Sequence, residues 1–362
     1  MNRTIKTLSL SPFLGRTICI SDIHGNLKSL LALLDKVNYQ PGIDRLILLG
    51  DLIEKGNQNL DTLHTIMEMT KIENTYCLMG NCDFICKNVL YSYRLDFLKQ
   101  VLLSRSHSLI HEMAQKIGLH FDQNTKMDTF CFQLRHHFLK ELSFLNDLPH
   151  VIEDDSFIFS HAAIQDEEKF GDDFKEVMTI PFFKEKDVFF QKKVIVGHLP
   201  VTEYARSIAN FNPILDHQRN IYSIDGGNIV KKGGQLNALL INQNTISYET
   251  IDFLPQARVI HSVKPSIQIP LFVTWNHGQI QILKEETYQY KVYCPYLHRT
   301  FWVDKEFVYK QGEIFHATDF TNYEIPLEKG DLVKIVFSYR DKVQIKKNGV
   351  LGWTYKKNIE IV

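Results

Sequence analysis

Five short apolar runs in the first 200 residues are each followed at once by polar residues, most of them beside a glycine. The runs are rich in Ile, Leu, Val and Phe, which is typical of strands buried inside a sheet. The polar groups that follow are 21–26 (SDIHGN), 50–56 (GDLIEKG), 80–83 (GNCD), 160–162 (SHA) and 197–200 (GHLP). Because ligands bind beyond the carboxyl ends of the strands in an open α/β sheet, we expect the five groups to meet at one place.

Helical and strand patterns alternate over the first 250 residues, which predicts an α/β fold. Apolar residues recur at helical spacing over 27–37, between strands predicted at 16–21 and 45–49. A second helix is predicted near 60–72, and the further strands are 76–79, 157–160, 194–196, 221–224 and 237–251, the last with a turn at Gln243-Asn244. Residues 84–148 instead carry leucines and phenylalanines three and four apart, which predicts a helical insertion or cap.

The chain changes character near 255–270, which predicts one domain at 1–255 and another at 256–362. The second is rich in aromatic and β-branched residues between turn signals, as is typical of a small all-β module. Segments 302–305 (WVDK) and 353–356 (WTYK) look like two copies of one pattern, so two small barrels are one interpretation. Residues 322–362 resemble a bacterial SH3-type barrel through KGDLVKI and a later GW. The resemblance implies a groove for a peptide or protein partner, although Trp302 and Trp353 could equally be core.

Composition narrows the partners and the compartment that we expect. Lys plus Arg number 41 against 42 for Asp plus Glu, so no overall charge attracts nucleic acid or an anionic membrane. No window reaches 18 consecutive apolar residues, and the N-terminus lacks the features of a signal peptide. The six cysteines are sparse, which favours free thiols in a reducing compartment. We therefore expect a cytoplasmic protein with no nucleic-acid or membrane partner.

Six side chains of the five polar groups have the chemistry of metal ligands: Asp22, His24, Asp51, Asn81, His161 and His198. Two divalent ions about 3.5–4 Å apart need one shared carboxylate and flanking nitrogen and oxygen ligands. Asp51 is the candidate bridge, with Asp22 and His24 on the first ion and the other three side chains on the second. The imidazoles argue against calcium or magnesium alone, so we expect manganese, with iron, zinc or nickel as alternatives. Each motif alone has a plainer interpretation, because Asp-x-His and Gly-Asn are ordinary turn chemistry.

As a set, these motifs resemble those of the calcineurin-like metallophosphoesterase superfamily, and they are most similar to its phosphoprotein-phosphatase branch. The family pattern GDxHG, GDxxDRG, GNHE, HAG, GHTP is matched here by SDIHG, GDLIEKG, GNCD, SHAA and GHLP. Residues 223–239 (SIDGG…GGQLNAL) resemble the ending of bacterial members, which include symmetrical diadenosine-tetraphosphate hydrolases and Ser/Thr phosphatases. The resemblance covers roughly 16–250 and implies a four-layer α-β-β-α sandwich. It also implies hydrolysis of phosphoric esters or anhydrides by a metal-bridging hydroxide, with a nucleoside polyphosphate or a phosphoprotein as the substrate.

Three of the departures from the family pattern fall at positions that the family uses for phosphate binding or proton transfer. Lys55 stands where the family has a phosphate-clamping arginine, and with Asn81 it is the candidate phosphate-binding pair. Cys82 replaces the histidine that protonates the leaving oxygen, and Glu54 replaces its carboxylate partner, so both join Asp51 as candidate catalytic residues. A thiol is a poor substitute for an imidazolium acid. We therefore expect a preference for leaving groups that need no proton, such as nucleotide phosphates or aryl oxides.

The same departures leave other interpretations open. Cys82 could be a buried thiol that only packs. Asp83 either orients the Asn81 loop or caps the helix that follows, and we favour the cap. The chain could also be a catalytically weak phosphate or nucleotide sensor, or an adaptor with structural metals, that signals through its C-terminal module.

Overall fold

The computed structural model describes residues 3–243, 245–264 and 268–362, and the chain divides into two compact units. The first unit consists of Met1–Pro200 and Pro213–Asp252. The second consists of Val201–Asn212 and Phe253–Val362. The segment Val201–Asn212 thus belongs with the C-terminal part of the chain. Our prediction of a single boundary between residues 255 and 256 did not include this segment.

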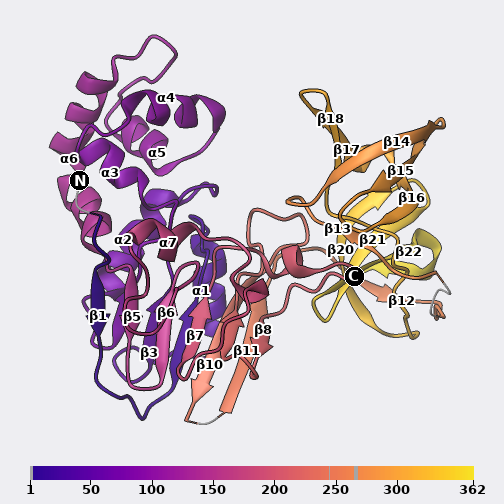
Figure 1. Ribbon diagram of the computed structural model, residues 1–362, viewed down its shortest axis with the longest axis horizontal. Helices are drawn as coiled ribbons and strands as arrows, with labels where there is room; N and C mark the ends of the chain where they lie inside the picture. The colour runs from indigo at the N-terminus through magenta and orange to yellow at the C-terminus, as the bar shows by residue number, and fades with distance from the viewer. Residues whose placement is uncertain (1–2, 244, 265–267) are drawn as a thin grey trace. The chain divides into compact units, whose positions relative to one another are not determined.

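Among the described residues, the first unit contains a six-stranded and a five-stranded sheet (Figure 1). The order in the first sheet is β1 (Thr7–Ser9), β5 (Val151–Glu153), β6 (Phe157–Ser160), β7 (Lys193–Val196), β9 (Ile221–Ser223) and β8 (Ile214–Asp216). The order in the second is β11 (Thr245–Ile251), β10 (Leu236–Asn242), β2 (Thr17–Ile20), β3 (Arg45–Leu48) and β4 (Thr75–Cys77). β6, β7 and β9 are parallel, as are β2, β3 and β4. Asn244 of the predicted turn before β11 lies outside the described residues.

Alternating side chains on the central strands separate two apolar layers. Cys19 of β2 packs with Ile47 of β3 and Phe159 of β6, so this cluster lies between the two sheets. Ile18 points the other way, into a cluster that includes Leu30 of helix α1 (Leu27–Lys36). Both faces of these strands are therefore buried, as is usual for parallel strands covered by helices. The predicted α/β fold, with two sheets packed face to face and helices on the outside, is confirmed.

The helices beside the sheets are α1, α2 (Asn59–Met69), α7 (Phe174–Thr179) and the 3₁₀ turn η1 (Phe183–Glu185). Four further helices form the insertion that follows β4: α3 (Ile85–Leu90), α4 (Leu95–Ser104), α5 (Leu109–Lys116) and α6 (Met127–Asp147). They gather together beyond one end of the sheets (Figure 1). The predicted helical segment at 84–148 is confirmed, and it begins directly after the GNCD motif.

The second unit is built from strands and short 3₁₀ turns. One five-stranded sheet has the order β16 (Arg299–Asp304), β15 (Gln289–Cys294), β14 (Gln279–Glu285), β18 (Ile314–Ala317) and β17 (Val308–Gln311). The other has the order β22 (Val350–Tyr355), β21 (Lys342–Lys347), β20 (Leu332–Tyr339), β12 (Gln256–Val259) and β23 (Ile359–Ile361). A small sheet pairs β13 (Phe272–Val273) with β19 (Phe320–Thr321), and the segment Val201–Tyr204 forms η2.

The two copies of the tryptophan pattern occupy matching places in these sheets. β16 leads through η3 (Lys305–Phe307) into β17, and β22 leads through η4 (Lys356–Asn358) into β23. The two tryptophans nevertheless differ in environment. Trp353 is buried and donates its indole N–H to the Thr321 carbonyl oxygen, whereas Trp302 is 36% exposed. The core interpretation therefore holds for Trp353 only.

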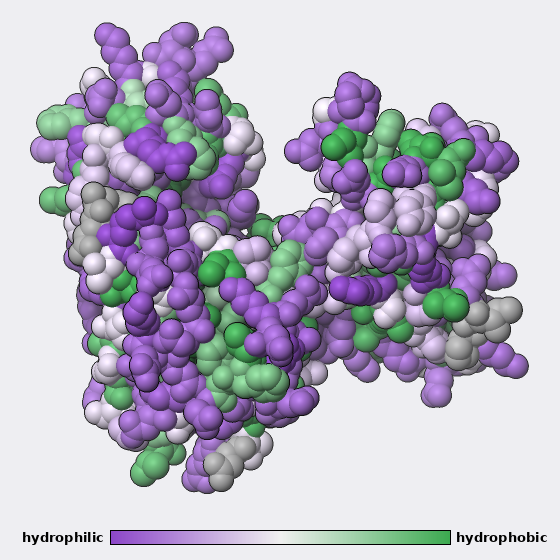
Figure 2. All heavy atoms as spheres, in the orientation of Figure 1, coloured by the Kyte–Doolittle hydropathy of each residue, from purple (hydrophilic) through white to green (hydrophobic). Residues whose placement is uncertain are grey.

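Two further features of the fold are the apolar character of the helices and the hydropathy of the surface. None of the helices in the described part of the chain has the length and apolar character needed to cross a membrane. On the face shown in Figure 2, hydrophobic residues are interspersed with hydrophilic ones.

Candidate active site

The candidate ligands follow five strands at the edges where those strands end. Asp22 and His24 follow β2, Asp51 follows β3, and Asn81 follows β4 in the second sheet. His161 follows β6 and His198 follows β7 in the first sheet. Because neighbouring strands in each set are parallel, their carboxyl ends lie at one edge. The structure brings all six side chains together, as expected.

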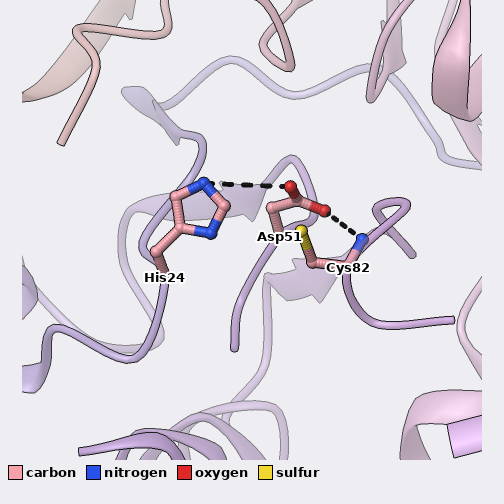
Figure 3. A group of neighbouring side chains, drawn as sticks. All are labelled: His24, Asp51 and Cys82. Carbon is pink, nitrogen blue, oxygen red and sulfur yellow. Dashed lines mark hydrogen bonds and ion pairs between the residues drawn. The ribbon is translucent and has the colours of Figure 1, made fainter. Parts of the chain in front are cut away.

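Asp51 lies at the centre of this group. Its Oδ2 is 3.8 Å from Nε2 of His24, and its Oδ1 is 3.4 Å from Nε2 of His161. Oδ1 also accepts a hydrogen bond of 2.7 Å from the backbone N–H of Cys82. Figure 3 shows the Asp51 carboxylate between His24 and Cys82, with one oxygen directed to each. One carboxylate therefore faces ligands on both sides.

Asn81 and Asp22 connect the remaining side chains. The Oδ1 atom of Asn81 is 3.1 Å from Nε2 of His161 and 2.8 Å from Nδ1 of His198. The backbone N–H of His198 donates to Oδ2 of Asp22 at 3.0 Å, and Oδ1 of Asp22 is 3.8 Å from Nε2 of His24. Two sets of ligand atoms each lie within 4.8 Å of one another: Asp22, Asp51 and His161, and His24, Asp51 and Cys82. Asp51 belongs to both sets.

The ligand atoms of the site are better suited to binding a cation than to forming hydrogen bonds with one another. Within the described residues, Oδ1 of Asp22 is buried without a hydrogen-bond partner, and it lies 3.8 Å from Nε2 of His24. Nδ1 of His161 can only donate to the Leu49 carbonyl oxygen, 2.8 Å away, so a neutral ring turns the lone pair of Nε2 toward two oxygen acceptors. Unpaired buried acceptors cost about 1–3 kcal/mol each. Metal ions would satisfy these lone pairs together.

Burial and neighbouring charges set the proton affinities of these groups. Burial, and then the Asp51 charge, raise the pKa of Asp22 well above its usual value. Burial acts to raise the pKa of Asp51 as well, but the His161 and His24 imidazoles and the hydrogen bonds from Cys82 together lower that pKa. Burial lowers the pKa of His24, and it lowers the pKa of His198 to about 4. Neutral imidazoles keep the lone pairs that metal binding requires.

The ligand loops are held in a strained backbone conformation. Asp22, His24, Asp51 and His198 have φ between 50° and 69°, the left-handed region that most residues avoid. Two neighbouring glycines make the close approach of the loops feasible. A Cβ on Gly80 would lie 2.1 Å from the Asp51 nitrogen, and a Cβ on Gly197 would lie 2.3 Å from Oδ2 of Asp22. Such strain clusters at functional sites, where the surrounding structure holds it in place.

Asp83 corrects one of our predictions. We favoured a helix cap, but α3 begins after Phe84 with no side-chain cap hydrogen bond. Oδ1 of Asp83 accepts from the backbone N–H groups of Leu52 and Ile53, and Oδ2 accepts from that of Gly80. Burial raises the pKa of Asp83 to about 8. The side chain therefore joins the Asp51 loop to the Asn81 loop, which was the alternative that we had set aside.

Glu54 and Lys55 are neighbours in the sequence, but one side chain is buried and the other is exposed. The carboxylate of Glu54 is fully buried and accepts from the Arg105 guanidinium and from the Leu109 backbone N–H, the latter at 2.9 Å. These partners belong to the helical insertion, and they occupy both oxygens of the side chain that the family pairs with its proton donor. Lys55, by contrast, is exposed to solvent. Sequence reasoning missed Arg105, because it lies 51 residues from Glu54 and belongs to none of the motifs.

Asn59 and Glu112 extend the connection between insertion and ligand loops. Oδ1 of Asn59 accepts from the Glu54 backbone N–H at 2.6 Å, and Nδ2 donates to the Gly56 carbonyl oxygen. Glu112 of α5 accepts from the backbone N–H groups of Asn59 and Leu60, so it caps the start of α2. The insertion thus supports the 51–59 loop from outside.

Residues 15–227 match the family model for calcineurin-like phosphoesterases. Symmetrical bis(5'-nucleosyl)-tetraphosphatases are among the curated relatives. The protein from Pseudomonas fluorescens (strain Pf0-1) is 31% identical over 116 residues, which cover 31% of this chain and 39% of that protein. A Pseudomonas putida (strain GB-1) protein is 30% identical over 112 residues, 30% of this chain and 38% of the relative. The chain therefore spans about two fifths of the length of these relatives.

Solved structures to which this chain is similar include a putative diadenosine tetraphosphatase and a protein serine/threonine phosphatase from Saccharomyces cerevisiae. The first has a TM-score of 0.42 at 15% identity and covers 69% of this chain and 99% of that one. The second has a TM-score of 0.46 at 10% identity and covers 69% of this chain and 84% of that one.

Proposed function

The chain belongs to the calcineurin-like phosphoesterase family, and we propose that it is a metal-dependent hydrolase of phosphoric esters or anhydrides that acts on nucleoside polyphosphates. The observation that carries the proposal is the position of Asp51, whose two carboxylate oxygens face ligands on opposite sides. Two-metal hydrolases use such a shared carboxylate.

We assign Asp22, His24 and Asp51 to one ion, and Asp51 with Asn81, His161 and His198 to the other, with manganese as the metal. The unpaired Oδ1 of Asp22, which faces Nε2 of His24 at 3.8 Å, supports this assignment. The chemistry that such a pair supplies when bound is a water of lowered pKa and neutralisation of charge on the phosphate oxygens. Iron, zinc and nickel suit the same mixed donor set.

The chain's own residues would bind the phosphate and hold the reacting groups in place. Lys55 is exposed beside the buried loop and offers a point charge to a phosphate oxygen, without the two-pronged geometry of an arginine. Asp83 fixes the distance between the Asp51 and Asn81 loops through three backbone hydrogen bonds. Leu49 accepts from Nδ1 of His161 and so turns Nε2 toward Asp51.

The preference for anhydrides follows from the group that stands in for the usual acid. Cys82 presents a thiol, and the Glu54 carboxylate is bonded to Arg105 and Leu109. Burial and the neighbouring Asp51 carboxylate raise the pKa of the Cys82 thiol well above its usual value, which makes it a weak proton donor. General acid catalysis contributes about 10²–10⁴-fold to the rate. A nucleotide phosphate leaves without a proton, whereas the serine oxygen of a phosphoprotein needs one.

A substrate series tests the proposal. Purified protein with added Mn²⁺ is assayed on a dinucleoside tetraphosphate, on p-nitrophenyl phosphate and on a phosphoserine peptide. We expect the first two to be hydrolysed faster, and Asp51→Asn to abolish all turnover while the far-UV circular dichroism is unchanged. Equal rates on the peptide would contradict the substrate preference, and turnover by Asp51→Asn would contradict the role of the carboxylate.

The altered acid pair also favours a second candidate, a catalytically weak phosphate or nucleotide sensor. In that case the C-terminal module would recruit a peptide or protein partner. A pocket of about 300 Å³ in the second unit supports a partner site there, since Trp302, Tyr339 and Arg340 contribute to its lining. Turnover of p-nitrophenyl phosphate at ordinary enzymatic rates would exclude the sensor.

A further inference from the structure

An aromatic pocket of about 310 Å³ adjoins the candidate metal ligands within the first unit. Its volume falls within the range of small-molecule sites. Asn81 lines the pocket, and its Oδ1 is also the atom that faces His161 and His198. Thr179 lines it too, and its backbone is hydrogen-bonded to His198. A ligand in the pocket would therefore lie next to a phosphate bound at the metal site.

One wall of the pocket is backed by a column of stacked rings. The His150 and Phe174 rings are 5.2 Å apart at 18°, and the Phe174 and Phe84 rings are 5.7 Å apart at 21°. Tyr93 meets Phe84 edge-on at 6.4 Å. Phe84, Tyr93 and Phe174 all line the pocket. Rings packed in this way offer flat, preorganised apolar surface at little cost in side-chain entropy.

A fourth aromatic side chain in the lining is open to solvent. Phe97 of α4 is 47% exposed, and the Arg94 guanidinium lies 4.6 Å from its ring centre. The Arg94 guanidinium occupies one side of the ring, and the exposed remainder of the ring is available for stacking. Met178 adds a soft apolar contact from α7.

The charges in the lining have one sign. Arg94 and Lys175 both contribute and are both exposed, and none of the described residues in the lining carries a carboxylate. The pocket thus combines ring-binding surface with positive charge. A phosphorylated compound that contains an aromatic ring matches both properties, and a nucleotide is the compound of that kind that the proposed function supplies.

We propose that this pocket binds the nucleobase of the substrate, stacked against Phe97 and the Phe84–Tyr93 wall, while the attached phosphate lies at the metal ligands. The inference rests on the proposed function and extends it to the part of the substrate that does not react. Stacking of bases on aromatic side chains tolerates different bases, so adenine and guanine nucleotides should both bind.

The test compares adenosine 5'-monophosphate with ribose 5-phosphate, which carries the same sugar and phosphate but no base. Each is titrated calorimetrically into the full chain with Mn²⁺, so the readout does not depend on turnover. We expect the nucleotide to bind tighter by about 5- to 150-fold, the contribution of one base stacked on an aromatic residue. Phe97→Ala should remove most of this ratio and leave the affinity for ribose 5-phosphate unchanged.

Phe132→Ala is the matched control, because Phe132 is another exposed phenylalanine of the insertion, 59% exposed on α6. It should leave the ratio unaltered. Equal affinities for the two ligands in the unmodified protein, or the same loss in both variants, would overturn the inference. A phenyl phosphate that binds more tightly than the nucleotide would overturn the nucleobase assignment in favour of an aryl group.

The outcomes also separate this inference from the proposed function. Hydrolysis of phosphate esters without any preference for the base would refute the pocket alone. Base-dependent binding without turnover on any phosphate ester would refute the hydrolase and leave the pocket standing.

Discussion

Removing the guanidinium that pairs with Glu54 should destabilise the first unit in a way that depends on pH. The Glu54 carboxylate is fully buried, and Arg105 is its charged partner. Burial raises the pKa of Glu54 to about 6 from 4.5, against the opposing effect of Arg105. Arg105→Met keeps an apolar stem of similar length and deletes the charge.

The size of the effect follows from the protonation state of Glu54. The folded state holds an extra proton between pH 4.5 and about 6, so the contribution of this group to stability is lost as the pH rises through that window. At pH 8 the variant leaves the Glu54 carboxylate buried and ionised without a charged partner, which costs about 3–5 kcal/mol. If taking up a proton costs less than this, the carboxylate is protonated instead and the loss of stability is that smaller free energy. At pH 5 the folded state already carries the proton, and we expect a loss of about 1 kcal/mol from the missing hydrogen bond.

Urea unfolding at pH 5 and pH 8, followed by circular dichroism, measures both values. The double variant Arg105→Met/Glu54→Gln is the control, because it removes the charge together with its partner and should recover most of the stability at pH 8. A loss that is equal at the two pH values, or below about 1 kcal/mol at pH 8, would refute the account of the buried pair.

Three further variants probe the site itself. Cys82→His should raise turnover on alkyl phosphates by about tenfold or more and leave aryl phosphates little changed, since only the former need a strong proton donor; steady-state rates on both classes decide this. Lys55→Arg should lower the KM for phosphate esters several-fold through a two-pronged contact, and an unchanged or higher KM would speak against phosphate binding at this position. Gly197→Ala should weaken manganese binding by at least tenfold while the fold persists, because the new Cβ would meet Oδ2 of Asp22. Calorimetric titration with Mn²⁺ measures this affinity, and an unchanged affinity in the variant would contradict the prediction.

The ligand cluster could be predicted because each of its members directly follows a strand. Apolar runs place the strands, parallel neighbours align their ends, and the polar residue types then converge without any knowledge of side-chain contacts. The helical insertion could be predicted for a similar reason, because its period of three to four is local. Neither prediction required knowledge of individual long-range side-chain contacts.

The residues that escaped prediction depend on long-range contacts. Nothing near Arg105 in the sequence indicates that it pairs with Glu54, and nothing near Glu112 indicates that it caps α2. Asp83 has a local interpretation as a cap, but its carboxylate reaches the 52–53 amides from another loop. The short strand β1 is exposed on all three residues and pairs only at the edge with β5, so it lacks the apolar pattern that reveals a strand.

Metal content is the most direct measure of the central claim. Protein purified and dialysed against Mn²⁺, then freed of loose metal by gel filtration, is analysed by inductively coupled plasma mass spectrometry. Our account predicts two manganese ions per chain, and at most one in folded Asp51→Asn, because that variant loses the carboxylate that both ligand sets share. A chain that retains no transition metal, or an Asp51→Asn chain that still holds two ions, would contradict it.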